Sequence, residues 1–215
     1  MGTKARRERE REQRRQHILS CAKELFMIKG LSFTTMEDVA KRAELSQGTL
    51  YLYFKNKEDL FASLNLMTLQ FIYDETEKVY INTELGPDEK ILKLKDVFYR
   101  TYIYDPLILR NILRLQLEDA LLTLSSDLLS QINTLTKNSM TLMAKIYEDG
   151  VRQGVFREEK GIVIADGMWG MFIGIVLYEG AKNRINPKKD FLKSTFDVAF
   201  MNFCRGIKKS DSDEA

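Results

Sequence analysis

The chain has 215 residues, enough for one large domain or two smaller ones, and its hydrophobic content of 44% is ordinary for a globular protein. Its formal net charge is only +2, but residues 1–60 hold 13 basic and 9 acidic residues, so positive charge gathers in the N-terminal part. The charged N-terminus argues against a signal peptide. The sole histidine, His17, lies near the start of the first predicted helix, so we expect no histidine cluster for a metal, no conventional serine triad, no cofactor and no enzyme activity.

The first segment, residues 1–13, is a basic N-terminal arm. From Lys4 to Arg15 the sequence KARREREREQRR holds seven basic and three acidic residues. Opposite charges four apart, such as Glu10 and Arg14, favour a frayed extension of the first helix. Two interpretations remain open: a solvated charged tail, or an arm that lies along DNA or reaches its minor groove.

Residues 34–57, TTMEDVAKRAELSQGTLYLYFKNK, have the pattern of two short helices joined by a tight turn. Thr34 or Thr35 is placed to cap the first helix, because a hydroxyl there accepts from the free amides of the opening turn, and Glu37 or Asp38 can reach back. Apolar residues at helical spacing, two of them small alanines, let a second helix cross closely. They are Met36, Val39, Ala40 and Ala43. The pattern indicates a helix-turn-helix that reads DNA; the alternative is a helical hairpin of an unrelated protein.

The second predicted helix, residues 47–54, carries few charges and forms a recognition surface. Its presented residues are Gln47, Gly48, Thr49, Tyr51 and Tyr53. The N-terminal residues of such a helix face base edges in the major groove, so Gln47 and Thr49 are placed to read bases and the glycine lets the backbone come close. The two tyrosines are placed to reach sugars and phosphates.

A third helix is expected to follow directly. Asn56 is placed to cap it and Asp59 to complete the cap. Lys57 lies in the first turn, where the free amides already favour a phosphate. Positioning on the backbone and reading of bases are therefore assigned to different residues.

The motif TT…VA…A…LSQGTLYLYFKNKEDL resembles the DNA-binding signature of the TetR-type transcriptional repressors. The likeness is strong over residues 14–61, including QHILSCAKELFMIKGLSFTT, and extends elsewhere only to the helix layout and to GVRQGVFR near residues 150–157. It implies that Thr35, Gln47, Thr49, Tyr51 and Lys57 occupy the positions that the family uses on DNA. With Gly48, Tyr53 and Lys55 they make up the predicted DNA-binding set.

One residue departs from that family pattern. The family usually has glycine in the turn between the two helices, and this chain has Glu44. If the turn residue is left-handed, a non-glycine side chain costs about 1 kcal/mol. A carboxylate near the phosphates would also soften the affinity for DNA.

The predicted fold is all-α, with about nine helices. Residues 14–56 form a three-helix DNA-binding domain, and residues 57–208 form an effector-binding and dimerisation domain. This second domain begins with a long helix from Lys57 to about Asn82, followed by five more helices separated at Gly86-Pro87, Asp105-Pro106 and Asn186-Pro187. The acidic tail, residues 209–215, is expected to be disordered.

The most apolar stretch runs from Ile162 to Tyr178. It is too short for a membrane span and contains Asp166, so no membrane is expected. With the final helix, residues 190–208, it is the candidate dimer interface, and the resemblance implies the same, because this family pairs its last two long helices into a four-helix bundle. The interface residues are Gly170, Gly174, Phe196 and Phe200; the alternative is that both helices are intrachain core.

A small-molecule effector is expected between the helices of the second domain. The candidate lining residues are Phe71, Phe98, Tyr102, Asn111, Arg114, Met140, Met143, Trp169 and Phe172. Their aromatic and methionine-rich character would suit an apolar or aromatic effector, with an acidic group near Arg114. Core packing is the alternative role for each.

The sequence thus predicts a cytoplasmic homodimer that binds a palindromic operator on double-stranded DNA, most simply as a repressor released by an effector. Cys21 and Cys204 lie in apolar helical patterns and are expected to be core residues in a reducing cytoplasm. Three other interpretations stay open: a transcriptional activator of the same fold, a protein-interaction module whose motif no longer reads DNA, and a small helical enzyme.

Overall fold

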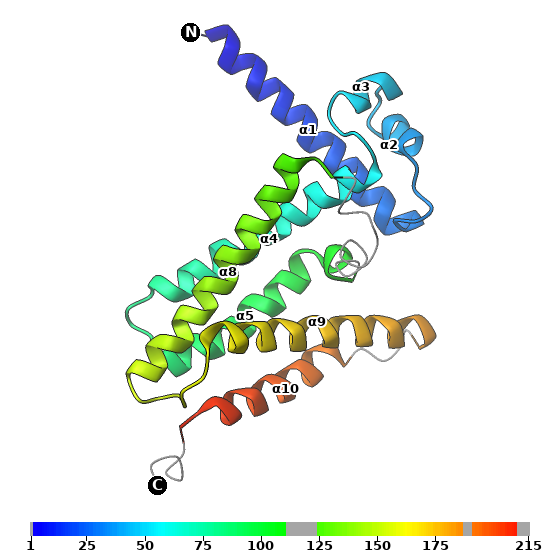
Figure 1. The fold of residues 1–215 in the computed structure, drawn as a ribbon. Coiled ribbons are helices and arrows are strands. Elements are labelled where there is room, and N and C mark those ends of the chain that lie inside the picture. Colours follow the sequence, from blue (N-terminus) through cyan, green and yellow to red (C-terminus); the bar gives the residue numbers. More distant parts are fainter. Residues whose placement is uncertain (1, 111–123, 187–190, 210–215) are drawn as a thin grey trace. The chain divides into compact units, whose positions relative to one another are not determined.

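The computed structural model describes residues 2–110, 124–186 and 191–209, and nearly all of them are helical (Figure 1). The helices with complete bounds are α1 (Gly2–Lys29), α2 (Met36–Arg42), α3 (Gln47–Tyr51), α4 (Lys57–Ile81), α5 (Pro87–Tyr104), α8 (Ser126–Arg152), α9 (Gly161–Ile185) and α10 (Leu192–Ile207). Residues 106–110 are also helical. Within the described ranges, the β structure is one isolated bridge between Phe156 and Lys208. The prediction of an all-α chain of about nine helices is confirmed.

The chain divides into two compact units. The first comprises Met1–Met67 with Asn111–Ser130, and the second comprises Thr68–Arg110 with Gln131–Ala215. Among the described residues, the first unit therefore holds α1, α2, α3 and the beginnings of α4 and α8, and we call it the reader unit. The second unit holds the rest of α4, α5, most of α8, and α9 and α10.

Helix α1 includes residues 2–13 of the predicted arm. Residues 4–14 are exposed on every side, and the helix enters the core of the reader unit only where Ile18, Leu19, Ala22 and Phe26 are buried. The expectation that the arm extends the first helix is confirmed. Gly30, with φ +85°, ends the helix in the left-handed conformation that glycine adopts without a Cβ clash, and its N–H donates to the Phe26 carbonyl at 3.0 Å.

The later helices begin or end at the proline, glycine and small polar residues that the sequence indicates. Pro87 occupies the first turn of α5, where its missing N–H costs no hydrogen bond, and Asp105 follows the last turn. Ser125 precedes α8, and Gly154, with φ +73°, turns the chain just beyond it. Asn186 is the C-terminal cap of α9. These helices of the second unit thus start and stop where proline, glycine and small polar residues stand.

An aromatic cluster forms the core of the second unit. Phe98 of α5 stacks on Phe172 of α9 with ring centroids 5.1 Å apart, and Trp169 meets Phe98 at 5.8 Å. From α10, Phe196 and Phe200 approach Phe98 at 6.4 and 6.3 Å. Burying one such ring stabilises the fold by about 1.5–3 kcal/mol, and paired rings add to this. This cluster joins α5, α9 and α10.

Helix α9 is unusual in its apolar character. Of the part of the chain that the structure describes, one segment, Gly161–Asn183, is long and apolar enough to cross a membrane by length and composition. A core helix meets the same criterion, and α9 supplies Met168, Phe172 and Val176 to the buried interior of the second unit. Packing within the protein therefore accounts for these three residues, whereas Ile162, Val163 and Tyr178 of the same helix are exposed.

Candidate nucleic-acid interface

Helix α3 presents an exposed polar surface on a buried anchor. Leu50 is fully buried, whereas Gln47 and Gly48 are exposed, Thr49 is half-buried and Tyr51 keeps 51% of its surface accessible. The helix ends at Tyr51, three residues earlier than the sequence predicts. The reason is local: the N–H groups of the next two residues bond to carbonyls only three positions back, which tightens the last turn.

Ser46 is the N-cap of α3, a role that was not predicted from the sequence. Its hydroxyl accepts from the Thr49 N–H at 3.1 Å, and the two hydroxyls lie 2.9 Å apart. A serine followed by a helix of polar and small residues is the signal that could have identified it. Ser46 therefore holds the Thr49 side chain in place, so the predicted base-reading hydroxyl is not free to rotate.

Helix α2 is held by a capping box. The Thr35 hydroxyl accepts from the Asp38 N–H at 3.1 Å, and the Asp38 carboxylate accepts from the Thr35 N–H at 3.0 Å. Of the two pairs that the sequence allowed, Thr35 with Asp38 is the one formed. Lys29 donates to the same carboxylate at 2.6 Å. This bond, followed by the two bonds from Thr35, lowers the pKa of Asp38 to about 2.

The turn between α2 and α3 contains the one non-glycine residue with positive φ in the described ranges. Glu44 has φ +56°, in the left-handed region. The conditional expectation is thus met: the residue that stands where the TetR-type pattern has glycine is left-handed. The strain of about 1 kcal/mol follows from the contact of its Cβ with the backbone.

Residues after α3 connect the surface to α4. The Asn56 side chain accepts from the Asp59 N–H at 2.7 Å, which confirms the predicted cap. Asp59 in turn accepts from the Lys55 N–H at 3.2 Å. The Lys57 ammonium donates to the Ser32 carbonyl at 3.3 Å and lies in the first turn of α4. Lys55 is exposed, and Tyr53 is half-buried.

Arg15 connects α1 to this surface, a role that was not predicted from the sequence. Its guanidinium lies 5.2 Å from the centre of the Phe54 ring and donates to the Ser63 hydroxyl at 3.1 Å. Cation–π contact and hydrogen bond together fix the side of α1 that faces the end of α3 and the start of α4. A basic residue within a basic arm gives no sequence signal of such a role.

His17 is exposed on α1, with its Nε2 3.8 Å from the Cys21 sulfur. Both cysteines are buried as free thiols, as expected for core residues. Burial raises the pKa of Cys204 to about 11, which keeps it protonated. The described residues contain no group of three or more metal-ligating side chains.

The predicted effector residues are partly brought together. Phe98, Trp169 and Phe172 meet in the aromatic cluster, and Met143 is fully buried. Phe71 instead stacks on Tyr104 at 4.4 Å. Tyr102 and Met140 are half-buried. Asn111 and Arg114 lie outside the described residues.

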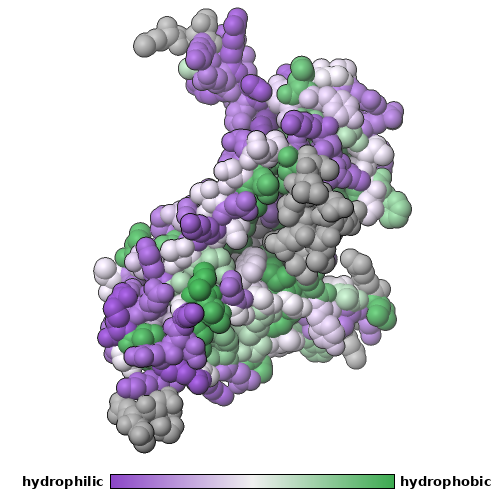
Figure 2. Space-filling view, in the orientation of Figure 1, coloured by the Kyte–Doolittle hydropathy of each residue, from purple (hydrophilic) through white to green (hydrophobic). Residues whose placement is uncertain are grey.

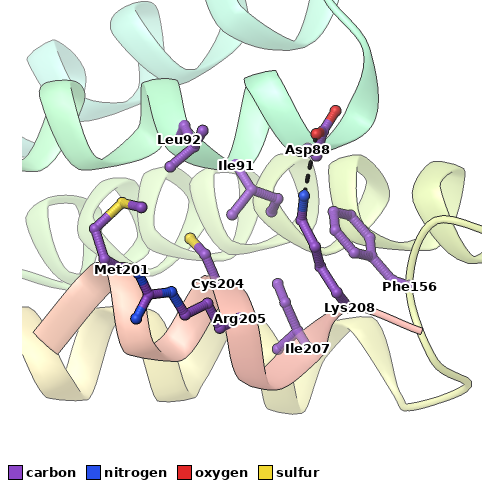
Figure 3. Close-up of a pocket in the computed structure, with 9 residues that line it drawn as sticks. All are labelled: Asp88, Ile91, Leu92, Phe156, Met201, Cys204, Arg205, Ile207 and Lys208. Atoms are coloured by element: carbon purple, nitrogen blue, oxygen red, sulfur yellow. Dashed lines mark hydrogen bonds and ion pairs between the residues drawn. The ribbon is translucent and has the colours of Figure 1, made fainter. Parts of the chain in front are cut away.

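A separate cavity opens in the second unit, between the start of α5, the segment after α8 and the end of α10 (Figure 3). It measures about 230 Å³. Its lining residues are Asp88, Ile91, Leu92, Phe156, Met201, Cys204, Arg205, Ile207 and Lys208. None of them belongs to the predicted effector set. An ion pair of 3.4 Å between Lys208 and Asp88 crosses one side, and the volume is below the roughly 300 Å³ of ordinary ligand pockets.

The four predicted dimer-interface residues fall into two classes. Phe196 and Phe200 are 1% and 0% exposed within the single chain, so their assignment to an interface is corrected: they belong to the aromatic core. Gly170 and Gly174 are exposed on α9, and a Cβ placed on either would have no neighbour within 4 Å. The intrachain alternative therefore holds for the phenylalanines, and the glycines remain candidates.

The reader unit contains the segment that matches a known protein family. Residues 18–64 match the family model described as bacterial regulatory proteins, tetR family. The HTH-type transcriptional regulator AcrR of Shigella flexneri is 42% identical over 55 residues, which is 26% of each chain. That match spans about a quarter of the relative's length.

Two longer similarities reach into the second unit. The fatty acid metabolism regulator protein of Bacillus subtilis is 28% identical over 152 residues, covering 70% of this chain and 75% of that one. The solved structure of the TetR family transcriptional regulator PfmR from Thermus thermophilus has a TM-score of 0.70 at 21% identity, over 89% of this chain and 99% of that one. The structural likeness shows a shared fold.

Proposed function

We propose that this chain, which belongs to the tetR family of DNA-binding transcriptional regulators, is a cytoplasmic repressor that binds a palindromic operator as a homodimer and leaves it when a small molecule binds. The observation that carries the DNA-binding part is the surface of α3. Its polar residues are exposed, its backbone is fixed by Ser46, and Leu50 anchors it in the core. A rigid helix that presents polar side chains without burying them is suited to major-groove reading.

The roles proposed for the residues of this surface follow from their positions in α2, α3 and α4. Gln47 and Thr49 at the start of α3 contact bases, with Gly48 allowing close approach. Tyr51, Tyr53, Lys55 and Lys57 contact the sugar-phosphate backbone, as does Thr35 at the N-terminus of α2. The Lys57 contact with Ser32 is with a neutral carbonyl, so a phosphate can replace it without leaving a charge unpaired.

Dimerisation is proposed through α9 and α10. The exposed residues of α9 include Val163, Gly167, Gly170, Gly174 and Tyr178, which follow one another at three- and four-residue spacing. Val198 of α10 is 64% exposed. Glycines with open space in front of them allow a second helix to approach closely, and the apolar neighbours supply area to bury.

The effector is proposed to be apolar or aromatic. The interior of the second unit is apolar and contains the aromatic cluster, and one relative bears the name of a fatty acid metabolism regulator. Release of DNA requires that the effector bind the non-DNA conformation more tightly, by about 1.4 kcal/mol for each tenfold loss of DNA affinity. Transcriptional activation by the same DNA-bound dimer is the second candidate, and the position of the operator relative to a promoter distinguishes the two.

The experiment that tests this function is selection of bound sequences from a random DNA pool by the purified protein, with Tyr51→Ala as the control. Enrichment of an inverted repeat, with half-sites about 34 to 36 Å or a multiple apart and loss of enrichment in the variant, is the expected result. Absence of enrichment and of salt-sensitive DNA binding from well-folded protein would refute it and favour a protein-interaction role.

A further inference from the structure

The N-terminal arm of α1 carries a stripe of one charge. Lys4, Arg7, Arg11 and Arg14 precede the buried Ile18 by fourteen, eleven, seven and four residues. At about 100° per residue these separations place all four side chains within roughly 40° of the line through Ile18. We call these four residues the basic stripe.

The remaining charges of the arm lie away from that line. By the same geometry the acidic residues are displaced from it by roughly 80° to 120°, and Arg6 and Arg9 by roughly 120° to 180°. Arg6 pairs with Glu10 at 2.7 Å. The line of the stripe therefore carries basic side chains alone, with the acidic side chains on its flanks and Arg6 and Arg9 on the far side.

The basic stripe lies on the side of α1 that faces the rest of the reader unit. Ile18 and Ala22 on the same line are fully buried there. Arg15, beside the stripe, contacts Phe54, three residues after α3, and Ser63 of α4. Beyond these contacts the arm continues with no packing partner, and its exposed surface is strongly hydrophilic (Figures 1 and 2). The stripe thus continues the face against which α3 is held.

The charges at the start of α1 do not favour the helix dipole. The first turn of α1 contains no acidic residue, although acidic side chains there would interact favourably with the positive end of the helix dipole. Lys4, Arg6 and Arg7 instead add positive charge at that end. An anion placed along the stripe would relieve this repulsion, and a series of anions at regular intervals would match its length.

We propose that the basic stripe is a second DNA-contacting surface, which lies along the phosphate backbone beside the groove that α3 enters. This inference rests on the proposed function, because it requires that α3 face DNA. From Lys4 to Arg14 the helix rises by roughly 15 Å, enough to follow two or three phosphates at the roughly 7 Å separation of neighbours along a strand. Its contacts supply affinity and salt dependence, whereas base preference stays with α3.

The test compares two variants of equal composition. Arg7→Gln/Arg11→Gln removes two charges from the stripe, and Arg6→Gln/Arg9→Gln removes two from the opposite side. Glutamine and arginine have similar helix propensities, and all four side chains are exposed, so both variants should fold with unchanged melting temperatures. Fluorescence anisotropy then measures the binding of an operator duplex obtained by selection, and of a scrambled duplex, at several salt concentrations.

The stripe variant is expected to reduce the slope of log affinity against log salt by about 2 per protomer on both duplexes. It should leave the ratio of operator to scrambled affinity unchanged. The opposite-side variant should change the slope by much less. Equal slopes for the two variants would overturn the inference, while sequence-specific binding by the unmodified protein would leave the proposed function standing. Loss of all DNA binding by the unmodified protein would instead refute the proposed function.

Discussion

Glu44 is the residue at which side chain and backbone conformation conflict most. Its φ of +56° brings the Cβ close to the following carbonyl, which glycine would avoid. We expect Glu44→Gly to raise the free energy of unfolding by less than about 1 kcal/mol in urea denaturation, because the added chain entropy of the unfolded state offsets part of the relief of strain. Glu44→Ala keeps the Cβ and should give no such gain. Equal stabilisation by both variants would assign the effect to the carboxylate.

Asp38 should make stability depend on pH in the acid range. Its pKa in the folded protein is about 2, below the value of 3.8 expected in the unfolded chain, so it binds protons more readily when unfolded. Its contribution is therefore complete above about pH 4 and is lost as the pH falls towards 2. In Asp38→Asn, the unfolding free energy measured between pH 5 and 2 should fall less steeply than in the unmodified protein. Parallel curves would contradict this.

Gln47 and Lys57 should differ in the kind of DNA binding that they control. Gln47→Ala is expected to relax preference at one base position by about 1–3 kcal/mol, whereas Lys57→Ala should weaken binding to all sequences and lower the salt slope by about 1. Binding to a panel of single-base operator variants at several salt concentrations separates these effects. If both substitutions gave the same pattern, the separation of base reading from backbone contact would be wrong.

Side chains that act on neighbouring backbone could be predicted from the sequence, and those that act across the fold could not. Thr35 with Asp38 and Asn56 with Asp59 pair at a spacing of three, which the sequence displays directly. Arg15 reaches Ser63, 48 residues away, and nothing local marks that contact. Phe196 and Phe200 show the same limit: periodicity places them on one face of a helix, but only packing decides what covers that face.

At the scale of elements, the end of α8 depends on Gly150 for close packing. A Cβ at this position would lie 2.2 Å from the Phe156 ring and 3.0 Å from Pro87 of α5. Gly150→Ala should therefore lower the free energy of unfolding by about 1–3 kcal/mol, despite the better helix propensity of alanine. Gly48→Ala in α3 is the matched control, since its Cβ would meet only Ser46 at 3.9 Å. Equal unfolding midpoints for the two variants would show that Phe156 moves aside.

Helix ends marked by proline or glycine could be predicted from the sequence, and the unmarked end of α3 could not. Prolines and glycines mark the ends of α5 and α8, because each imposes a backbone conformation that helices cannot continue. The early end of α3 carried no such mark. The residues after Tyr51 have helix-compatible side chains, and the change there to hydrogen bonds three positions back has no sequence signal.

At the scale of the whole molecule, the exposed glycines of α9 give a test of assembly. Gly174→Arg should shift the dimer towards monomer in sedimentation velocity, because a long charged side chain would occupy the space needed by the second helix. The single chain has room for it, so the melting temperature of the monomer should not fall. Ile103→Arg on α5, at another exposed position, should leave assembly unchanged. A dimer unaffected by Gly174→Arg would move the interface elsewhere.

The aromatic cluster contains a natural fluorescent probe, the indole of Trp169. Trp169 is the only tryptophan of the 215 residues, and it lies against Phe98 and Phe172 in the second unit. Intrinsic emission excited at the red edge therefore reports on that unit alone, whereas circular dichroism reports on every helix. Denaturation curves from the two signals coincide only if both units unfold together. The chain thus contains its own spectroscopic label for learning whether the half that would sense an effector melts independently of the half that would hold DNA.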